Sequence, residues 1–414
     1  MDRENVILIT LDEFRPDRIE PYGQRRIKTP FINRIAEDGV LFETCMAPSC
    51  LTPISHAAIL TGLHSPHNGF RDPFCQIQAP RIAEIMKDNG YNTAGYVGID
   101  YLGEAQGFSA GFDVYDLPDE GSDMWPHRDR VHFGNLWQDK CFDFIRQNQS
   151  SPFFIWGHYF ECHSLTEIGL LKRGLLKEGY LPEFEYYDAK VELMDQRILF
   201  KPLLELLDKL NLYDKTTIVV MADHGTSLGE HEAPPAPGLG FRYPQHVFLY
   251  DEDIHIPLII KSPKLPKGKR VPGVVRGVDV VPTILDLADI ETFYSFDGQS
   301  LLPVVEAGEA KGLVNYSEEM WIERGPGDFQ GIRTDEYMYM IDRRNGDVEE
   351  FYDLANDPGQ QHNLMDSLAE EHRRVVKQMR AQVDLYYKAD DETSRVSKEK
   401  EKRIRDRLRD LHYI

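Results

Sequence analysis

The chain has 414 residues and a formal net charge of −22 at pH 7. Hydrophobic residues make up 41% and charged residues 28%, which is typical of a globular protein, and no stretch of about 18 uncharged apolar residues could span a bilayer. The acidic charge argues against nucleic acid and membrane surfaces as partners. It leaves open a small anionic ester that binds at a metal.

Residues 6–11 form an apolar run with Asp12 and Glu13 directly after it. Such a run is typical of a strand covered on both faces. It is too short and too acidic at its end for a secretory signal, although a processed precursor would look the same. The five cysteines, an odd number without paired metal spacing, favour reduced thiols. We therefore expect a cytoplasmic protein.

Residues 52–61 follow a loop and precede Gly62, a pattern that predicts a helix beginning at Thr52. Because backbone N–H groups at a helix start favour an anion, a hydroxyl at this place could act as a nucleophile. Thr52 followed by Pro53 is also the pattern of an ordinary N-cap with proline at the first helical position. Taken alone, this segment fits the cap better, because caps are far commoner than nucleophiles.

Short apolar or β-branched runs alternate with helical patterns along the rest of the first 300 residues. The runs are residues 92–97, 153–157, 216–221 and 256–261, and the helical patterns include residues 82–89 and 201–210. This alternation predicts an α/β fold with a mostly parallel central sheet flanked by helices on both faces. Chemistry in such sheets gathers at the carboxyl ends of the strands, where Asp12, His158 and Asp223 lie.

From about residue 312 the runs become shorter and are separated by turn residues, which predicts a smaller C-terminal antiparallel α+β lobe. Apolar residues spaced near three and four after Asp366 predict a helix, and a charged helix follows. We divide the chain into a catalytic domain at residues 1–311, a small sheet lobe at 312–365 and C-terminal helices at 366–414. The charged helix fits a solvated tail and an oligomer contact equally well, and we expect a homo-oligomer.

Asp12 and Glu13 at one strand end, with Asp223 and His224 at another, supply oxygen and imidazole ligands for a divalent cation. Thr52 could complete the site, because a threonine hydroxyl needs a metal or a base to become a nucleophile at neutral pH. Each signal is weak by itself, since acidic pairs and an Asp-His-Gly turn are also ordinary features of strand ends.

Histidines and one glutamate provide the other candidates. His56 lies four residues after Thr52 and so on the same side of a helix, where as an imidazolium it could bind an anionic oxygen. His158, Glu161 and His163 lie where an active-site loop would begin after an apolar strand. A structural role is the simpler interpretation for His64, His67, His127 and His231.

Together, these motifs resemble the sulfatase family of the alkaline phosphatase superfamily over roughly residues 5–365. The likeness rests on the order and spacing of residues 5–15, 29–33, 39–42, 57–62, 158–163, 222–225, 250–257, 280–285, 297–301 and 351–358. The resemblance implies that Asp12, Asp223 and His224 bind a metal, with Glu13 at a position where an aspartate is usual.

The resemblance also places His246 where sulfatases have a lysine against the substrate. A histidine there is similar to dinuclear relatives, so a second cation held by His246 with Glu161 or His163 is a further interpretation. We expect one divalent cation. Carboxylate ligands favour manganese, calcium or magnesium, whereas a histidine-built second site would favour zinc.

The sequence departs from the sulfatase pattern at the nucleophile. Sulfatases carry Cys-x-Pro-x-Arg, whose cysteine is oxidised to formylglycine. Counting back from Ala57 puts His56 at the arginine position and Thr52 at the cysteine position, while Cys50 lies two residues too early for the modification. Thr52 with His56 instead resembles the nucleotide pyrophosphatase and phosphodiesterase members of the superfamily.

A formylglycine hydrate expels sulfate by collapsing to the aldehyde, whereas a threonine sulfate has no such exit and a threonyl phosphate can be hydrolysed by water. We therefore expect a metal-dependent hydrolase of phosphate mono- or diesters or of phosphonates. The alternatives are a sulfatase without formylglycine, a phosphotransferase or mutase, and a non-catalytic binding protein. The expected catalytic residues are Thr52, His56, His163 and His246, the substrate-binding residues His158 and Glu161, and the metal ligands Asp12, Glu13, Thr52, Asp223 and His224.

Overall fold

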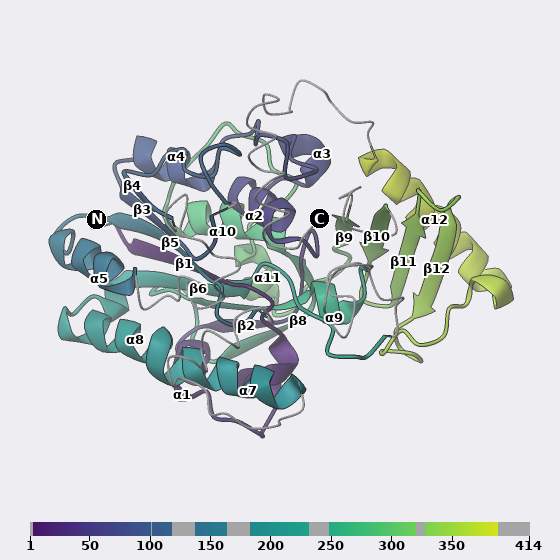
Figure 1. Cartoon of the computed structure of the whole chain (residues 1–414), viewed down its shortest axis with the longest axis horizontal. Helices are drawn as coiled ribbons and strands as arrows, with labels where there is room; N and C mark the ends of the chain where they lie inside the picture. Colours follow the sequence, from purple (N-terminus) through teal and green to yellow (C-terminus); the bar gives the residue numbers. More distant parts are fainter. Residues whose placement is uncertain are drawn as a thin grey trace, which may run out of the picture.

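A computed structural model describes residues 3–100, 102–117, 137–163, 183–231, 248–319 and 328–387. The largest element of the described chain is an eight-stranded sheet with the order β4-β3-β5-β1-β6-β7-β2-β8 (Figure 1). β1 (Asn5–Leu11) pairs in parallel with β5 (Phe153–Tyr159) on one side and with β6 (Thr216–Ala222) on the other. These three strands carry the candidate site residues.

The outer strands extend this parallel centre. β3 (Asn92–Val97) and β4 (Val114–Asp116) continue the parallel pairing beyond β5. On the other side, β7 (His255–Lys261) runs antiparallel to β6 and to β2 (Val40–Met46), and β8 (Lys269–Arg276) lies parallel to β2 at the edge. The mostly parallel sheet confirms the α/β fold class predicted from the sequence.

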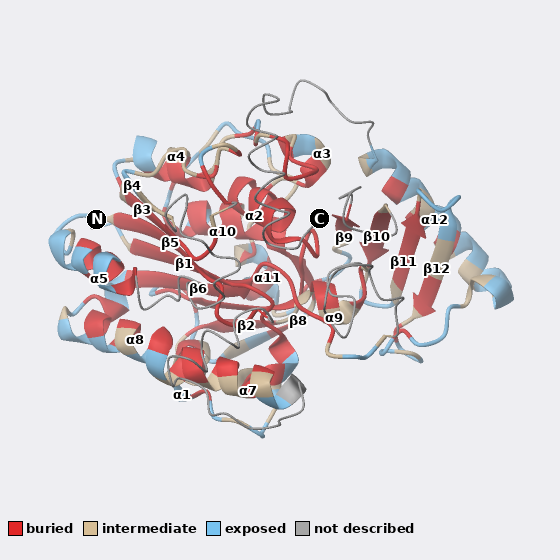
Figure 2. Cartoon of the chain, viewed as in Figure 1, coloured by how far each residue is buried: buried red, intermediate tan, exposed pale blue. Residues whose placement is uncertain are grey.

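Helices cover both faces of the large sheet (Figure 1). One face carries α2 (Thr52–Thr61), α4 (Ile82–Asp88) and α10 (Val280–Leu287), and the other carries α1 (Pro30–Glu37), α7 (Glu183–Leu193) and α8 (Phe200–Lys209). Shorter or peripheral helices are α3 (Ser65–Asn68), α5 (Gln138–Gln147), α9 (Asp251–Ile254) and α11 (Leu302–Ala307). Every residue of β1, β5 and β6 is buried, as expected for strands covered on both faces (Figure 2).

A second sheet is antiparallel and has the order β12-β11-β10-β9. Its strands are β9 (Asn315–Glu319), β10 (Phe329–Arg333), β11 (Tyr337–Asp342) and β12 (Val348–Asp353). α12 (Glu370–Tyr386) packs on this sheet and completes a separate apolar core. The small antiparallel lobe is therefore confirmed. The domain limits at residues 311 and 365 stay predictions, and the predicted charged helix near the C-terminus lies outside the described residues.

β9 connects the small sheet to the segment that precedes α2. The backbone N–H of Glu318 donates to the carbonyl oxygen of Pro48 at 3.1 Å, and the Ser317 hydroxyl donates to that of Ala47 at 2.7 Å. The buried carboxylate of Glu318 forms a two-point ion pair with Arg71, at 2.9 and 3.1 Å. The C-terminal lobe thus holds the entry to α2, the helix that begins at Thr52.

All five cysteines are buried as thiols rather than joined in disulfides. Among the described residues, no helix has both the length and the apolar character needed to cross a membrane.

The buried pair between Arg71 and Glu318 should stabilise the contact between the small sheet and the segment that follows α3. We expect Arg71→Met to lower the free energy of unfolding by about 3–5 kcal/mol, because it leaves the buried Glu318 carboxylate without a cation, bonded to the Tyr316 hydroxyl. Arg34→Met is the matched control, since the side chains of Arg34 and Asp208 are 37% and 45% exposed and such pairs contribute only ~0–1 kcal/mol. Urea and thermal melts measure both losses, and equal losses would contradict the expectation.

Candidate active site

Neighbouring strands bring polar side chains to one edge of the large sheet. Asp12 follows β1, and Asp223 and His224 follow β6, at the level where these two parallel strands end together. His158 lies on β5 directly opposite Thr10 of β1. All of these side chains are buried. The topology therefore brings together residues from three separate segments, as the carboxyl ends of parallel strands do.

Thr52 is the first residue of α2, and its hydroxyl points toward this cluster. Its Oγ1 lies 3.3 Å from Oδ2 of Asp12 and 3.0 Å from Nε2 of His224. Leu51 occupies the N-cap position, and no side-chain cap bond forms there. The structure therefore corrects the N-cap interpretation of Thr52, because the hydroxyl contacts side chains of two other segments rather than the N–H groups of its own helix.

His224 presents one ring nitrogen to the cluster. Its Nδ1 lies 2.8 Å from the carbonyl oxygen of Gly225, so Nδ1 carries the proton and donates it to this bond. Nε2 then carries the lone pair, which faces the Thr52 hydroxyl, and lies 3.4 Å from Oδ2 of Asp223. A carbonyl that fixes the tautomer in this way is typical of metal-binding histidines. Gly225 permits the turn, because a Cβ there would lie 2.1 Å from the carbonyl oxygen of Glu252.

Glu13 and His163 form a second contact at the same edge. Oε1 of Glu13 lies 3.0 Å from Nε2 of His163, and the two side chains are only 1% and 3% exposed. The backbone of Glu13 is left-handed, with φ of 56°, which is uncommon for a residue other than glycine. The ligand atoms of Asp12, Glu13 and His163 all lie within 4.8 Å of one another. The segments after β1 and β5 thus meet beside the Thr52 cluster.

His56 lies one helical turn after Thr52 and is completely buried. Its Nδ1 donates to the carbonyl oxygen of Thr52 at 2.8 Å, and its Nε2 lies 2.9 Å from Oγ1 of Thr10. Thr10 accepts the indole N–H of Trp156 at 3.0 Å and so can donate its own proton to His56. Burial lowers the pKa of His56 to about 3. The bond to Thr52 and the low pKa favour a neutral His56 that supports the first residue of α2, and the expected role of His56 in catalysis stays a prediction.

His158 and Glu161 are both buried beside this cluster. Nε2 of His158 lies 3.3 Å from Oδ2 of Asp12, its ring meets His56 edge-on, and burial holds its pKa well below the ordinary value. Glu161 lies in the turn after β5. Their predicted roles in substrate binding stay predictions. His246 lies outside the described residues, and so does the second cation site that would be built on it.

The described donors fit a divalent cation. Ligand atoms of Asp12, Asp223 and His224 lie within 4.8 Å of one another, and all three residues are buried. Oδ2 of Asp223 is buried and accepts no hydrogen bond from the described residues. Burial raises the pKa of Asp223 well above its ordinary value, because a carboxylate charge is unfavourable in apolar surroundings. A bound cation would remove this penalty and hold the carboxylate ionised.

The loop at residues 223–231, which begins with the two ligand candidates, is anchored to the segment after β1. The guanidinium of Arg15 donates to the carbonyl oxygen of Thr226 at 2.9 Å and to the carboxylate of Glu230 at 2.8 Å. The Arg15 side chain is only 8% exposed. One buried arginine therefore connects the loops that follow β1 and β6.

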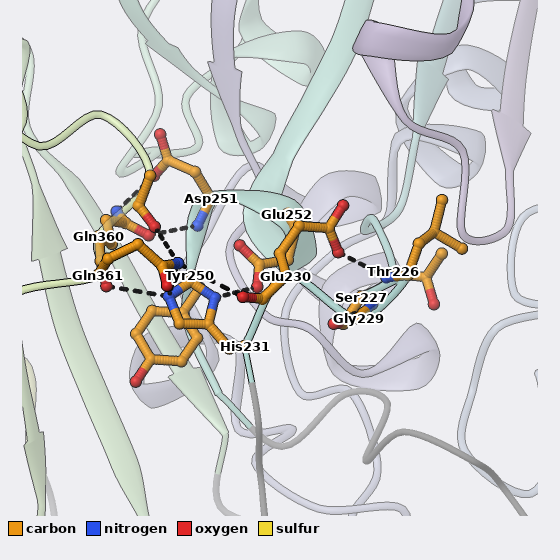
Figure 3. Close-up of polar contacts among 12 residues, drawn as sticks. Thr226, Ser227, Gly229, Glu230, His231, Tyr250, Asp251, Glu252, Gln360 and Gln361 are labelled. Atoms are coloured by element: carbon orange, nitrogen blue, oxygen red, sulfur yellow. Dashed lines mark hydrogen bonds and ion pairs between the residues drawn. The ribbon is translucent and has the colours of Figure 1, made fainter.

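The far end of this loop is anchored to the C-terminal lobe (Figure 3). His231 contacts the carboxylate of Glu252 through Nδ1 and the carbonyl oxygen of Gln360 through Nε2, the latter at 2.9 Å. Its ring stacks on Tyr250, with the ring centroids 3.8 Å apart. These contacts agree with the structural role that we expect for His231.

Several contacts of the site are not evident from the sequence. Ser55 donates to the carbonyl oxygen of Asp223 at 2.6 Å, and its position three residues after Thr52 on the helix is a signal that could have identified it. Tyr187 donates to the carbonyl oxygen of Glu13 at 2.5 Å, and Lys190 donates to that of His163 at 3.0 Å. Both come from α7, which carries no motif that points to the site.

Comparison with known proteins places these residues in a family. Residues 4–290 match the sulfatase family model, and residues 240–389 match the model for the C-terminal region of N-sulphoglucosamine sulphohydrolase. N-acetylglucosamine-6-O-sulfatase of Bacteroides thetaiotaomicron is 24% identical, over 87% of this chain and 82% of that protein. Arylsulfatase K of Mus musculus is 23% identical, over 87% of this chain and 76% of that protein.

Solved structures share the fold. A protein in complex with its substrate D-glucosamine-2-N,6-O-disulfate superimposes with a TM-score of 0.74 at 21% identity, covering 93% of this chain and 98% of its own. Phosphonate monoester hydrolase of Agrobacterium radiobacter gives a TM-score of 0.70 at 20% identity, covering 96% of this chain and 100% of its own. Because the sulfatase model matches well over half of the chain, this protein belongs to the sulfatase family, within the alkaline phosphatase-like superfamily.

Proposed function

We propose that this protein is a metal-dependent hydrolase that cleaves a sulfate ester. The observation that carries the hydrolase part of the proposal is the position of the Thr52 hydroxyl, 3.3 Å from Asp12 and 3.0 Å from His224 at the start of a helix. The relatives that are similar over most of their length are named sulfatases, which supports a sulfate ester over the phosphate ester expected from the sequence.

A phosphate or phosphonate ester is the second candidate, and the residue type at position 52 favours it. Water at a metal site can hydrolyse a threonyl phosphate, whereas a threonine sulfate lacks the aldehyde exit of formylglycine. One solved protein with this fold is named a phosphonate monoester hydrolase.

For both candidate ester classes, bonds would form and break in the same order. Oγ1 of Thr52 attacks the sulfur or phosphorus atom, the bond to the alcohol oxygen breaks, and the alcohol leaves with a proton. Water then cleaves the threonyl ester, which restores the hydroxyl and releases inorganic sulfate from a sulfate ester, inorganic phosphate from a phosphate monoester, or the phosphonate from a phosphonate ester. Oδ2 of Asp12 lies where it could accept the Thr52 proton. The first N–H groups of α2 have no partner within the helix and favour the negative oxygens of the ester.

The residues that would hold the cation are Asp12, Asp223 and His224, with Glu13 and Thr52 beside them. When bound, a divalent cation favours the alkoxide form of a hydroxyl and offsets the negative charge of the ester oxygens. An imidazole ligand favours a transition metal such as zinc over calcium or magnesium, which prefer oxygen ligands alone. We therefore propose zinc among the cations expected from the sequence.

Replacement of Thr52 tests the nucleophile. We expect Thr52→Ala to lower turnover by at least about 1,000-fold, because no hydroxyl remains to attack the ester, and we expect Thr52→Ser to retain part of the activity. Thr61→Ala is the control at the other end of α2, where the hydroxyl bonds to backbone groups, such as the carbonyl oxygen of Ala57 and the N–H of Leu63. Steady-state rates measure the effect, and unchanged turnover in Thr52→Ala would remove Thr52 from the mechanism.

The choice of metal can be tested at His224. We expect His224→Asn to weaken zinc binding by at least about 10-fold, because it replaces the imidazole ligand with an amide oxygen, while calcium binding changes less. His67→Asn is the control, since His67 pairs with Asp297 instead of with site residues. Competition with a chelator, checked by elemental analysis, gives the affinities. Equal zinc affinity in His224→Asn and the parent protein would exclude His224 as a ligand.

A matched substrate panel distinguishes the two ester classes. Aryl sulfate, aryl phosphate mono- and diester, and aryl phosphonate substrates with one common leaving group allow kcat/KM to be compared directly. We expect the sulfate ester to give the highest value. A clear preference for phosphate or phosphonate would replace our proposal with the second candidate. Transfer to an added alcohol with little free anion would instead indicate a transferase, and no turnover of any ester would indicate a binding protein.

A further inference from the structure

One turn of α7 reaches into the candidate site from a distant part of the chain. Tyr187 and Lys190 are three residues apart and so lie on the same side of the helix. Their exposed fractions are only 2% and 1%. A lysine is rarely buried to this extent unless its ammonium group is bonded, so its position requires an explanation.

Tyr187 holds the backbone that directly follows Glu13. Its hydroxyl donates to the carbonyl oxygen of Glu13 at 2.5 Å and accepts the backbone N–H of Arg15 at 2.8 Å. These two bonds fix the chain directly after Glu13, whose left-handed conformation a residue other than glycine keeps only where its surroundings enforce it. The conformation in turn places the Glu13 carboxylate against His163.

Lys190 holds the other member of this pair. Its ammonium donates to the carbonyl oxygen of His163 at 3.0 Å, while the imidazole of His163 lies against Glu13. The thiol of Cys162, next in the chain to His163, lies within electrostatic reach of Lys190 and also of Glu13 and Glu161. Lys190 thus brings a positive charge into the buried region that contains the carboxylates of the site.

α7 is itself held in place on its other side. A π-helical turn, Met194–Ile198, joins α7 to α8. Within this turn the buried carboxylate of Asp195 accepts the backbone N–H of Ile32 at 2.7 Å and that of Phe31 at 3.3 Å, at the start of α1. Tyr187 and Lys190 therefore project from a helix whose own position is fixed by a neighbouring helix.

We propose that Tyr187 and Lys190 are positioning residues that hold Glu13 and His163 at the cation. Both act through backbone carbonyl oxygens, so they place the two side chains without contacting the substrate. This inference rests on the proposed metal-dependent hydrolysis. It assigns a role in metal binding to α7, a helix that supplies no ligand. α7 sets the distance between the segments after β1 and β5, and so keeps the site assembled for a metal.

Two minimal substitutions test this role. Tyr187→Phe removes one oxygen atom, and Lys190→Met removes the charge but keeps a side chain of similar length. We expect each to weaken zinc binding by about 10–100-fold, the effect typical of losing a residue that orients a ligand. At saturating zinc, we expect kcat to fall while KM for the ester changes little. Lys190→Arg, which keeps the charge and the donors, should restore most of the zinc affinity.

Tyr186→Phe and Lys201→Met are the matched controls, because Tyr186 is adjacent on α7 and Lys201 is exposed on α8. Zinc affinity is measured by competition with a chelator, and thermal melts of the zinc-free proteins are recorded in parallel. Parent-like affinity in Tyr187→Phe and Lys190→Met would overturn the positioning role and leave the proposed function intact. The role would also be overturned if zinc affinity fell only in variants whose zinc-free form melts at a lower temperature than the zinc-free parent protein. Failure of the parent protein to bind zinc or any other divalent cation would overturn both proposals.

Discussion

The burial of three carboxylates at the ends of β1 and β6 is the constraint on which the rest of the site depends. Asp12, Glu13 and Asp223 are completely buried, and ionised carboxylates in such a place require a compensating cation. The fixed tautomer of His224 and the direction of the Thr52 hydroxyl agree with this need for a cation. Nε2 of His224 and Oγ1 of Thr52 both lie at the place where the cation would bind. The large sheet supplies the framework, because its parallel register brings the two strand ends to one level.

The C-terminal lobe supports this site from outside the large sheet. β9 bonds to the backbone of Ala47 and Pro48, just ahead of the helix that carries Thr52. Gln360 bonds to His231 at the end of the loop that carries His224. The lobe therefore holds both the nucleophile candidate and a metal-ligand candidate, although it supplies none of the expected site residues.

Thr52 remains the residue at which side-chain chemistry and family relationship favour different esters. Its hydroxyl suits phosphoryl transfer, while the relatives are named sulfatases.

Local patterns were sufficient to predict the parallel sheet, the small antiparallel lobe and the acidic strand ends, because apolar runs and the residues that follow them are contiguous in the chain. The meeting of Asp12, Asp223 and His224 followed from the rule that parallel strands end at one edge. The contacts of His56 could not be predicted, because helical spacing gives the direction of the ring but not the Thr10 and Trp156 side chains that surround it. Tyr187 and Lys190 were missed for a related reason: the bonds they make join segments more than 25 residues apart in the chain.

The central claim is that one divalent cation lies among Asp12, Asp223 and His224 with the Thr52 hydroxyl beside it. A crystal of the protein grown with zinc, with diffraction measured on both sides of the zinc absorption edge, tests this directly. The account predicts an anomalous peak at about 2.0–2.2 Å from oxygen atoms of both aspartates and from Nε2 of His224. A zinc peak elsewhere, or no peak among these residues at full zinc loading, would contradict it.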